Sequence, residues 1–89
     1  MAMVTLRYWA AAKAAAGVPE EKVAADTLAA ALARALAGGR SDERGAQFRA
    51  VLARSSFLID GQPVGGRAPD SVALADGAVI EVLPPFAGG

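Results

Sequence analysis

The sequence predicts a small domain of the α+β class, in which a mixed β-sheet has one main helix packed across one face. Residues 3–9 and 78–83 alternate apolar and polar side chains with period two, which is typical of half-buried strands. Between them, leucines recur at every fourth position after Asp26-Thr27, which indicates an amphipathic helix. A chain of 89 residues has room for one modest core.

The first and last strands, paired side by side in the centre of the sheet, give it two faces. The core face carries Val4, Leu6, Tyr8, Ile80 and Val82. The open face carries Thr5, Arg7, Trp9, Val79, Glu81 and Leu83. With this pairing, Arg7 and Glu81 on the open face could form an ion pair across the two strands, worth at most about 1 kcal/mol.

The segment after the first strand predicts a short connection and an edge strand. Residues 10–16 are nearly all alanine and predict one or two helical turns that end at Gly17. Residues 18–25 form a weaker second strand, which Pro19 confines to an edge of the sheet. We therefore expect the first two strands to form a hairpin.

The main helix begins at Asp26-Thr27, either of which suits the N-cap, and ends at Gly38-Gly39. Its apolar stripe consists of Leu28, Leu32 and Leu36, with Ala31 and Ala35 beside it. Residues 40–45 are polar and bounded by glycine, so they predict a loop. Residues 46–54 predict a short second helix that buries Phe48, Val51 and Leu52.

The last third of the chain predicts three strands joined by turns. Residues 57–59 form a strand that runs into a turn at Asp60-Gly61, and 62–64 form a short return strand. A second turn at Asp76-Gly77 leads into the last strand.

Composition limits the chemistry that the side chains can perform. The 9 basic and 9 acidic residues give no net charge, so we expect no nucleic-acid partner. The sequence has no cysteine and no histidine, so it offers no thiol nucleophile and neither of those metal ligands, and we predict no metal site. Without a membrane-length apolar run or a signal-peptide pattern, the expectation is a soluble protein of the cytoplasm.

The final six residues predict an extended tail, 84–89, beyond a single domain over 1–83. Pro84-Pro85 ends sheet pairing and stiffens the chain, while Gly88-Gly89 carries no side chain and fits a narrow channel. Because few side chains offer reactive groups, the Gly89 carboxylate is the predicted functional group. The alternative interpretation is an ordinary frayed terminus.

A docking surface is predicted at the base of this tail. Trp9, Leu83 and Phe86 would form an exposed apolar cluster, and aromatic anchors dominate interfaces. Arg7 and Glu81 extend the surface over the open face. The alternatives are that Trp9 packs under a loop as core, and that the charged side chains are simply solvated.

Two stretches carry a resemblance to a known family. The chain has Asp76-Gly77 before its last strand and ends in LPPFAGG over 83–89; near its start, Tyr8-Trp9-Ala10 is followed by Lys13 and Gly17. In these features it resembles the small subunit of molybdopterin synthase, a sulfur carrier with the ubiquitin-like β-grasp fold. The sequence departs from that family in its longer stretch over 38–54.

The resemblance implies a mechanism in which partners act on the tail. An ATP-dependent adenylyltransferase related to ubiquitin-activating enzymes adenylates the Gly89 carboxylate, and a sulfur donor converts it to a thiocarboxylate. The large synthase subunit accepts Pro84, Pro85, Phe86, Ala87 and Gly88 in its channel, where sulfur passes to precursor Z during molybdenum cofactor synthesis. The chain itself would then bind no cofactor and would not be an enzyme.

Three alternatives remain open at this point. The first is a sulfur carrier for cysteine or thiamine synthesis, although thiamine carriers typically lack the Pro-Pro pair. The second is a ubiquitin-like modifier, in which Gly89 is joined to lysines of other proteins. In an ordinary binding module, the Gly-Gly ending would be incidental.

Overall fold

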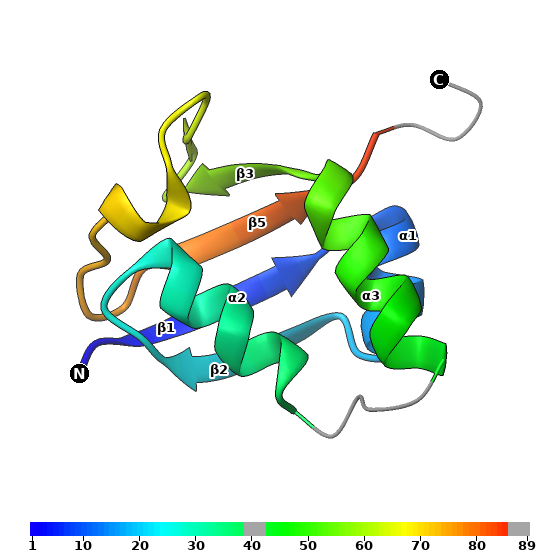
Figure 1. The fold of residues 1–89 in the computed structure, drawn as a ribbon. Helices are drawn as coiled ribbons and strands as arrows, with labels where there is room; N and C mark the ends of the chain where they lie inside the picture. Colours follow the sequence, from blue (N-terminus) through cyan, green and yellow to red (C-terminus); the bar gives the residue numbers. More distant parts are fainter. Residues whose placement is uncertain (39–42, 86–89) are drawn as a thin grey trace.

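The computed structural model describes residues 1–38 and 43–85, apart from the side chains of Glu43 and Arg44 (Figure 1). The elements are β1 (Met3–Tyr8), α1 (Ala10–Ala16), β2 (Glu20–Ala24), α2 (Leu28–Leu36), α3 (Glu43–Arg54), β3 (Ser56–Ile59), β4 (Gln62–Pro63), a 3₁₀ turn (Pro69–Ser71) and β5 (Val79–Leu83). None of the described helices is long and apolar enough to cross a membrane.

The sheet has the strand order β2-β1-β5-β3-β4, so the first and last strands are central neighbours. β1 and β5 run parallel, with Thr5 opposite Val79 and Tyr8 opposite Val82. β2 pairs antiparallel with β1 as the predicted hairpin, and β3 pairs antiparallel with β5 and β4. The mixed sheet confirms the predicted α+β class.

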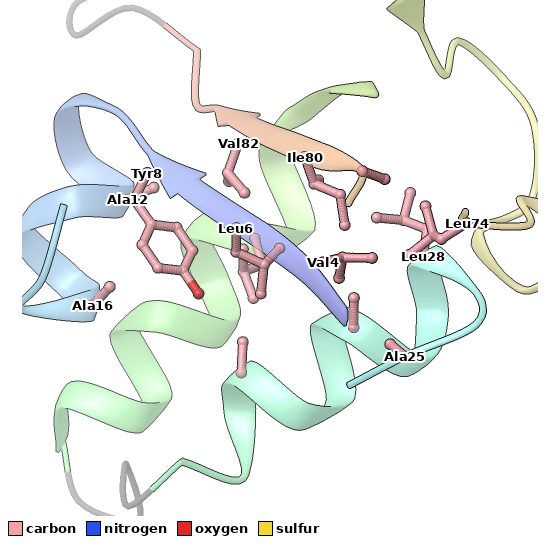
Figure 2. Close-up of a cluster of buried hydrophobic side chains, with 14 of the residues drawn as sticks. Val4, Leu6, Tyr8, Ala12, Ala16, Ala25, Leu28, Leu74, Ile80 and Val82 are labelled. Carbon is pink, nitrogen blue, oxygen red and sulfur yellow. The ribbon is translucent and has the colours of Figure 1, made fainter. Parts of the chain in front are cut away.

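The core lies between the sheet and the two helices α2 and α3, which cross the same face (Figure 1). From β1 and β5 it contains Val4, Leu6, Tyr8, Ile80 and Val82, each at most 2% exposed. Figure 2 shows these side chains extending from the two strands into one apolar cluster. The predicted core face is therefore confirmed.

The buried side of α2 differs from the predicted leucine stripe. Leu28 is fully buried, but Leu32 and Leu36 are only partly buried, whereas Ala31 and Ala35 are fully buried. The helix thus faces the core with two small side chains at its centre, and the two later leucines pack at its flank. Small side chains at this contact allow the helix backbone to lie close to its neighbours.

The helix α3 begins at Glu43, three residues before the predicted start at Ala46. The predicted loop over 40–45 is therefore wrong for 43–45, while residues 40–42 lie outside the described part of the chain. Gly45 is buried within the first turns of α3. The local sequence shows only that glycine has a poor intrinsic helix propensity. The helix forms nevertheless, because most of the stability of a helix in a protein comes from tertiary packing.

Of the two predicted cap residues, Thr27 is the one that caps α2. Its Oγ1 accepts a hydrogen bond of 3.1 Å from the backbone N–H of Ala30. Asp26 instead accepts a hydrogen bond of 2.8 Å from the backbone N–H of Ala2 through Oδ1. Asp26 therefore fixes the start of the chain beside α2.

The turn between β3 and β4 is the predicted Asp60-Gly61 turn. Both residues take positive φ, 50° at Asp60 and 82° at Gly61, as a two-residue type I′ hairpin turn requires. The backbone N–H of Val79 donates to Asp60 Oδ1 at 3.0 Å, so the same aspartate also anchors the start of β5.

Candidate functional site

The base of the tail lies at the end of the central strand β5. Leu83 is the last residue of that strand and pairs with Ser56 of β3. Pro84 is partly buried and Pro85 is exposed, so the chain turns from the sheet toward solvent over these two residues. The predicted roles of Phe86, Ala87, Gly88 and Gly89 fall outside the described residues and stay predictions.

Trp9 lies beside the tail base, at the junction of β1 and α1. Its backbone N–H donates to the carbonyl of Val82 at 3.3 Å, and its own carbonyl accepts from Ala12 N–H at 3.0 Å. Both bonds fix the Trp9 backbone against β5 and the first turn of α1. The Trp9 residue is 46% exposed, so the alternative that it is ordinary core is wrong.

The open face carries the residues predicted for it. Alternation along β1 and β5 places Arg7, Glu81 and Leu83 on the side of the sheet away from the core, and all three are partly exposed. Arg7 and Glu81 are opposite each other in the β1–β5 register. Trp9 follows the Tyr8–Val82 pair by one position, so it shares the tail end of this face with Leu83.

The predicted ion pair between Arg7 and Glu81 is wrong. Arg7 Nε lies 3.8 Å from Oε1 of Glu20, its register partner on the edge strand β2. The pair with Glu20 was not predicted because only the two central strands were compared. Residues directly opposite each other in an antiparallel pair, such as β1 and β2, also lie within side-chain reach. Since both side chains are about half exposed, 42% and 50%, this pair adds little stability.

A shallow hollow of about 390 Å³ lies against α1, which starts one residue after Trp9, and was not predicted from the sequence. It is lined by Ala10, Lys13, Ala14, Gly17, Val18 and Pro19. Val18 is 37% exposed, which adds a second large apolar side chain near this end of the sheet. The Val18-Pro19 pair is the feature of the sequence that could have indicated this exposure. Proline has no backbone N–H to donate, so regular strand pairing is interrupted next to Val18.

The open face carries apolar and charged side chains that are suited to binding. Within residues 1–38 and 43–85, no three His, Cys, Asp or Glu side chains gather in a way that could hold a metal ion. What the open face offers is apolar area around Trp9 and Leu83, together with the charges of Arg7 and Glu81. Such a combination favours recognition of another macromolecule.

No protein-family model matches the sequence, and no curated protein matches it. Solved structures do match. The solution structure of small archaeal modifier protein 1 (SAMP1) from Methanosarcina acetivorans superimposes with a TM-score of 0.76 at 22% identity, covering 100% of this chain and 98% of that one. A putative molybdopterin converting factor subunit 1 from Pyrococcus furiosus gives 0.72 at 21%, covering 97% and 100%.

A third match comes from an assembly. In the complex of subunits 1 and 2 of the molybdopterin-converting factor from Helicobacter pylori, the matching chain has a TM-score of 0.67 at 22% identity, with coverage of 98% and 99%. At such identities, the similarity establishes architecture and leaves function to be tested. The chain therefore has the ubiquitin-like β-grasp fold.

Proposed function

We propose that the chain is a sulfur carrier of molybdenum cofactor biosynthesis, with the Gly89 carboxylate as its working group. The observation that carries this proposal is the path of the backbone at the end of β5. The central strand passes directly into Pro84-Pro85 beside the exposed Trp9, so the segment that follows starts at the edge of a partly apolar surface. Structures of the same fold from proteins of molybdopterin synthesis support the assignment.

The chemistry starts from a poor electrophile. A carboxylate oxygen of Gly89 attacks the α-phosphorus of ATP, pyrophosphate leaves, and the resulting acyl-adenylate has AMP as a good leaving group. The outer sulfur of a persulfide donor then attacks the carbonyl carbon and AMP departs, which gives an acyl disulfide. A thiol cleaves its S–S bond, so that the thiocarboxylate is released and the thiol and the donor sulfur are oxidised to a disulfide. The ATP, the sulfur donor and the catalytic side chains belong to the activating partner.

The sequence of the tail suits delivery of this group. A glycine at the reacting position places no side chain beside the carbonyl, so the partner's channel can be narrow. Pro84 and Pro85 restrict the backbone before binding, which reduces the conformational entropy lost when the tail is ordered. In the proposed second step, the large synthase subunit receives residues 84–88 and passes the sulfur to precursor Z.

Intact-mass spectrometry tests the carrier proposal. After incubation with the cognate activating enzyme, ATP and a sulfur donor, we expect the mass gain of one oxygen replaced by sulfur, confined to the C-terminal fragment. A variant with one alanine added after Gly89 is the matched control and should show no gain. An unchanged mass of the wild-type chain, with an enzyme proved active on another carrier, would refute the proposal.

The pathway that receives the sulfur needs a test of its own, because the activation chemistry is the same for every sulfur carrier. A carrier for cysteine or thiamine synthesis would be activated in the same way and would differ only in the enzyme that receives sulfur. Incubating the thiocarboxylate form with precursor Z and the large synthase subunit distinguishes them. Formation of molybdopterin supports the proposed pathway, whereas retention of the thiocarboxylate assigns the carrier to another one.

A second candidate function is covalent protein modification, favoured by the fold similarity to SAMP1, which is named a modifier protein. In this case the Gly89 acyl-adenylate would be attacked by a lysine amine of another protein, giving an isopeptide bond with release of AMP. Immunoblots of cells expressing a tagged chain would show higher-mass species that disappear when Gly89 is deleted. The absence of such species would eliminate this candidate.

A further inference from the structure

A row of charged side chains crosses the open face of the sheet. Glu20 of β2 is opposite Arg7 of β1, Arg7 is opposite Glu81 of β5, and Glu81 is opposite Leu58 of β3. The order across four adjacent strands is therefore negative, positive, negative, apolar. All four residues lie on the same face, because directly opposite residues in a sheet point to the same side.

The two glutamates of this row differ in their surroundings. Glu20 is exposed on an edge strand and has Arg7 at 3.8 Å. Glu81 is partly buried on the central strand β5, and no ion pair or side-chain hydrogen bond to it is found among the described residues. Its neighbours along β5 on this face are Val79 and Leu83. Across the sheet it lies opposite Leu58 on one side and Arg7 on the other, but the guanidinium of Arg7 pairs with Glu20 and not with Glu81.

Glu81 also lies close to the tail. Only Val82 and Leu83 separate it from Pro84, and Leu83 is the neighbouring open-face position. Any protein that binds the chain from Pro84 onward and also contacts the sheet beneath it would cover Glu81. Covering a carboxylate among apolar side chains is unfavourable unless the partner supplies an opposite charge.

We propose that the enzyme that activates the Gly89 carboxylate presents a lysine or arginine side chain to Glu81, surrounded by apolar contacts to Leu58, Val79 and Leu83. The inference rests on the proposed function, since it requires an enzyme that activates the tail. Activation precedes both sulfur transfer and protein modification, so the inference holds for either candidate function. Glu81 is then a specificity-determining residue that excludes activating enzymes with an apolar or acidic group at this position.

The test compares charge reversal at the two glutamates of the row. Glu81→Lys places like charges together at the interface, whereas the control Glu20→Lys makes the same change on the same face but at the sheet edge. We expect Glu81→Lys to raise the KM of the activating enzyme for the carrier by about 30-fold or more, with little change in kcat. We expect Glu20→Lys to change KM by no more than about threefold.

Two further measurements complete the experiment. Glu81→Gln keeps the shape of the side chain and should raise KM by an intermediate factor, and thermal unfolding of each variant checks that the fold is retained. Rising sodium chloride should weaken binding of the wild type more steeply than binding of Glu81→Gln, because only the former has the charge pair. Equal KM values for the Glu81 and Glu20 reversals would overturn the inference.

Equilibrium binding in the absence of ATP separates this inference from the proposed function. If the enzyme binds the wild type, discriminates against Glu81→Lys and yet never modifies the tail, the proposed function fails and the charge contact stands. If it does not bind the wild type, the inference fails as well. Analytical ultracentrifugation tests the alternative that the open face binds a second copy of the chain. If the wild type is a dimer and Glu81→Lys is a monomer, the face is a dimer interface and the inference is overturned.

Discussion

Tyr8 connects three elements of the fold through one side chain. Its ring packs edge-to-face against Phe48 of α3, with the ring centroids 5.3 Å apart and an interplanar angle of 83°. Its hydroxyl donates to Oε2 of Glu21 on β2 at 2.6 Å. A residue on β1 that is 2% exposed thus reaches a carboxylate at the rim of the core, which satisfies its polar end.

Replacing Tyr8 by phenylalanine isolates that hydrogen bond. We expect Tyr8→Phe to lower the free energy of unfolding by about 1–2 kcal/mol, because the ring contacts remain while a charge-assisted hydrogen bond is lost. Urea denaturation measures the change. Glu20→Gln is the control, because Glu20 is on β2 next to Glu21 but is exposed, and it should change the free energy of unfolding by no more than about 0.5 kcal/mol. Equal effects of the two variants would contradict this account.

At the level of the elements, α3 contributes as much to the core as α2. It buries Phe48 completely and Leu52 to 7% exposure. The predicted helix was too short because Gly45 and the charged residues before it resemble a loop, although burial of Phe48 and Leu52 was predicted. What the local sequence lacks is the tertiary contact with Tyr8 that makes a helix favourable there.

Truncating Phe48 tests the role of α3. We expect Phe48→Ala to lower the free energy of unfolding by about 3–5 kcal/mol, from lost burial and the cavity left behind. For a domain of ordinary stability this is a large fraction of the total. Chemical denaturation followed by circular dichroism measures it, with Arg49→Ala on the exposed side of the same helix as the control. A loss below about 1 kcal/mol would mean that α3 is not part of the core.

The Asp60-Gly61 turn permits a test of backbone conformation alone. Gly61 has φ of 82° and no atom within 4 Å of a Cβ built on it, so an alanine there meets only conformational strain. We expect Gly61→Ala to cost about 1–2 kcal/mol. Gly66, equally open but without a positive φ, is the matched control, and Gly66→Ala should be neutral or slightly stabilising. Thermal unfolding compares them, and equal melting temperatures would exclude strain as the cause.

For the whole molecule, the proposed function predicts that position relative to the tail decides which exposed apolar residue contributes to binding. Trp9 and Met3 belong to opposite ends of the first strand region and are similarly exposed, 46% and 47%. Trp9 lies at the tail end. We expect Trp9→Ala to weaken binding to the activating enzyme by about 30-fold, and Met3→Ala by less than about threefold, as measured by calorimetry. Equal losses would indicate a binding surface that does not depend on the tail.

Much of the architecture follows from period-two and period-four patterns in the sequence. Val4, Leu6, Ile80 and Val82 repeat regularly enough to predict two strands, their shared face and their central position. The partner of Arg7 was not predictable in the same way, because it depends on the register of β2, which has a weak strand pattern. The hollow against α1 depends on how this helix leaves the sheet, a property of three-dimensional packing.

The parallel pairing of β1 and β5 has a mechanical consequence. β5 ends at Leu83 and lies beside β1 in parallel (Figure 1), so a force applied at Pro84 in the direction of β5 acts along the length of both strands. The hydrogen bonds of β5 to β1 and β3 run across that direction and carry the load together, in shear, instead of opening one by one. Such a force would therefore load these hydrogen bonds together without peeling the last strand from the sheet.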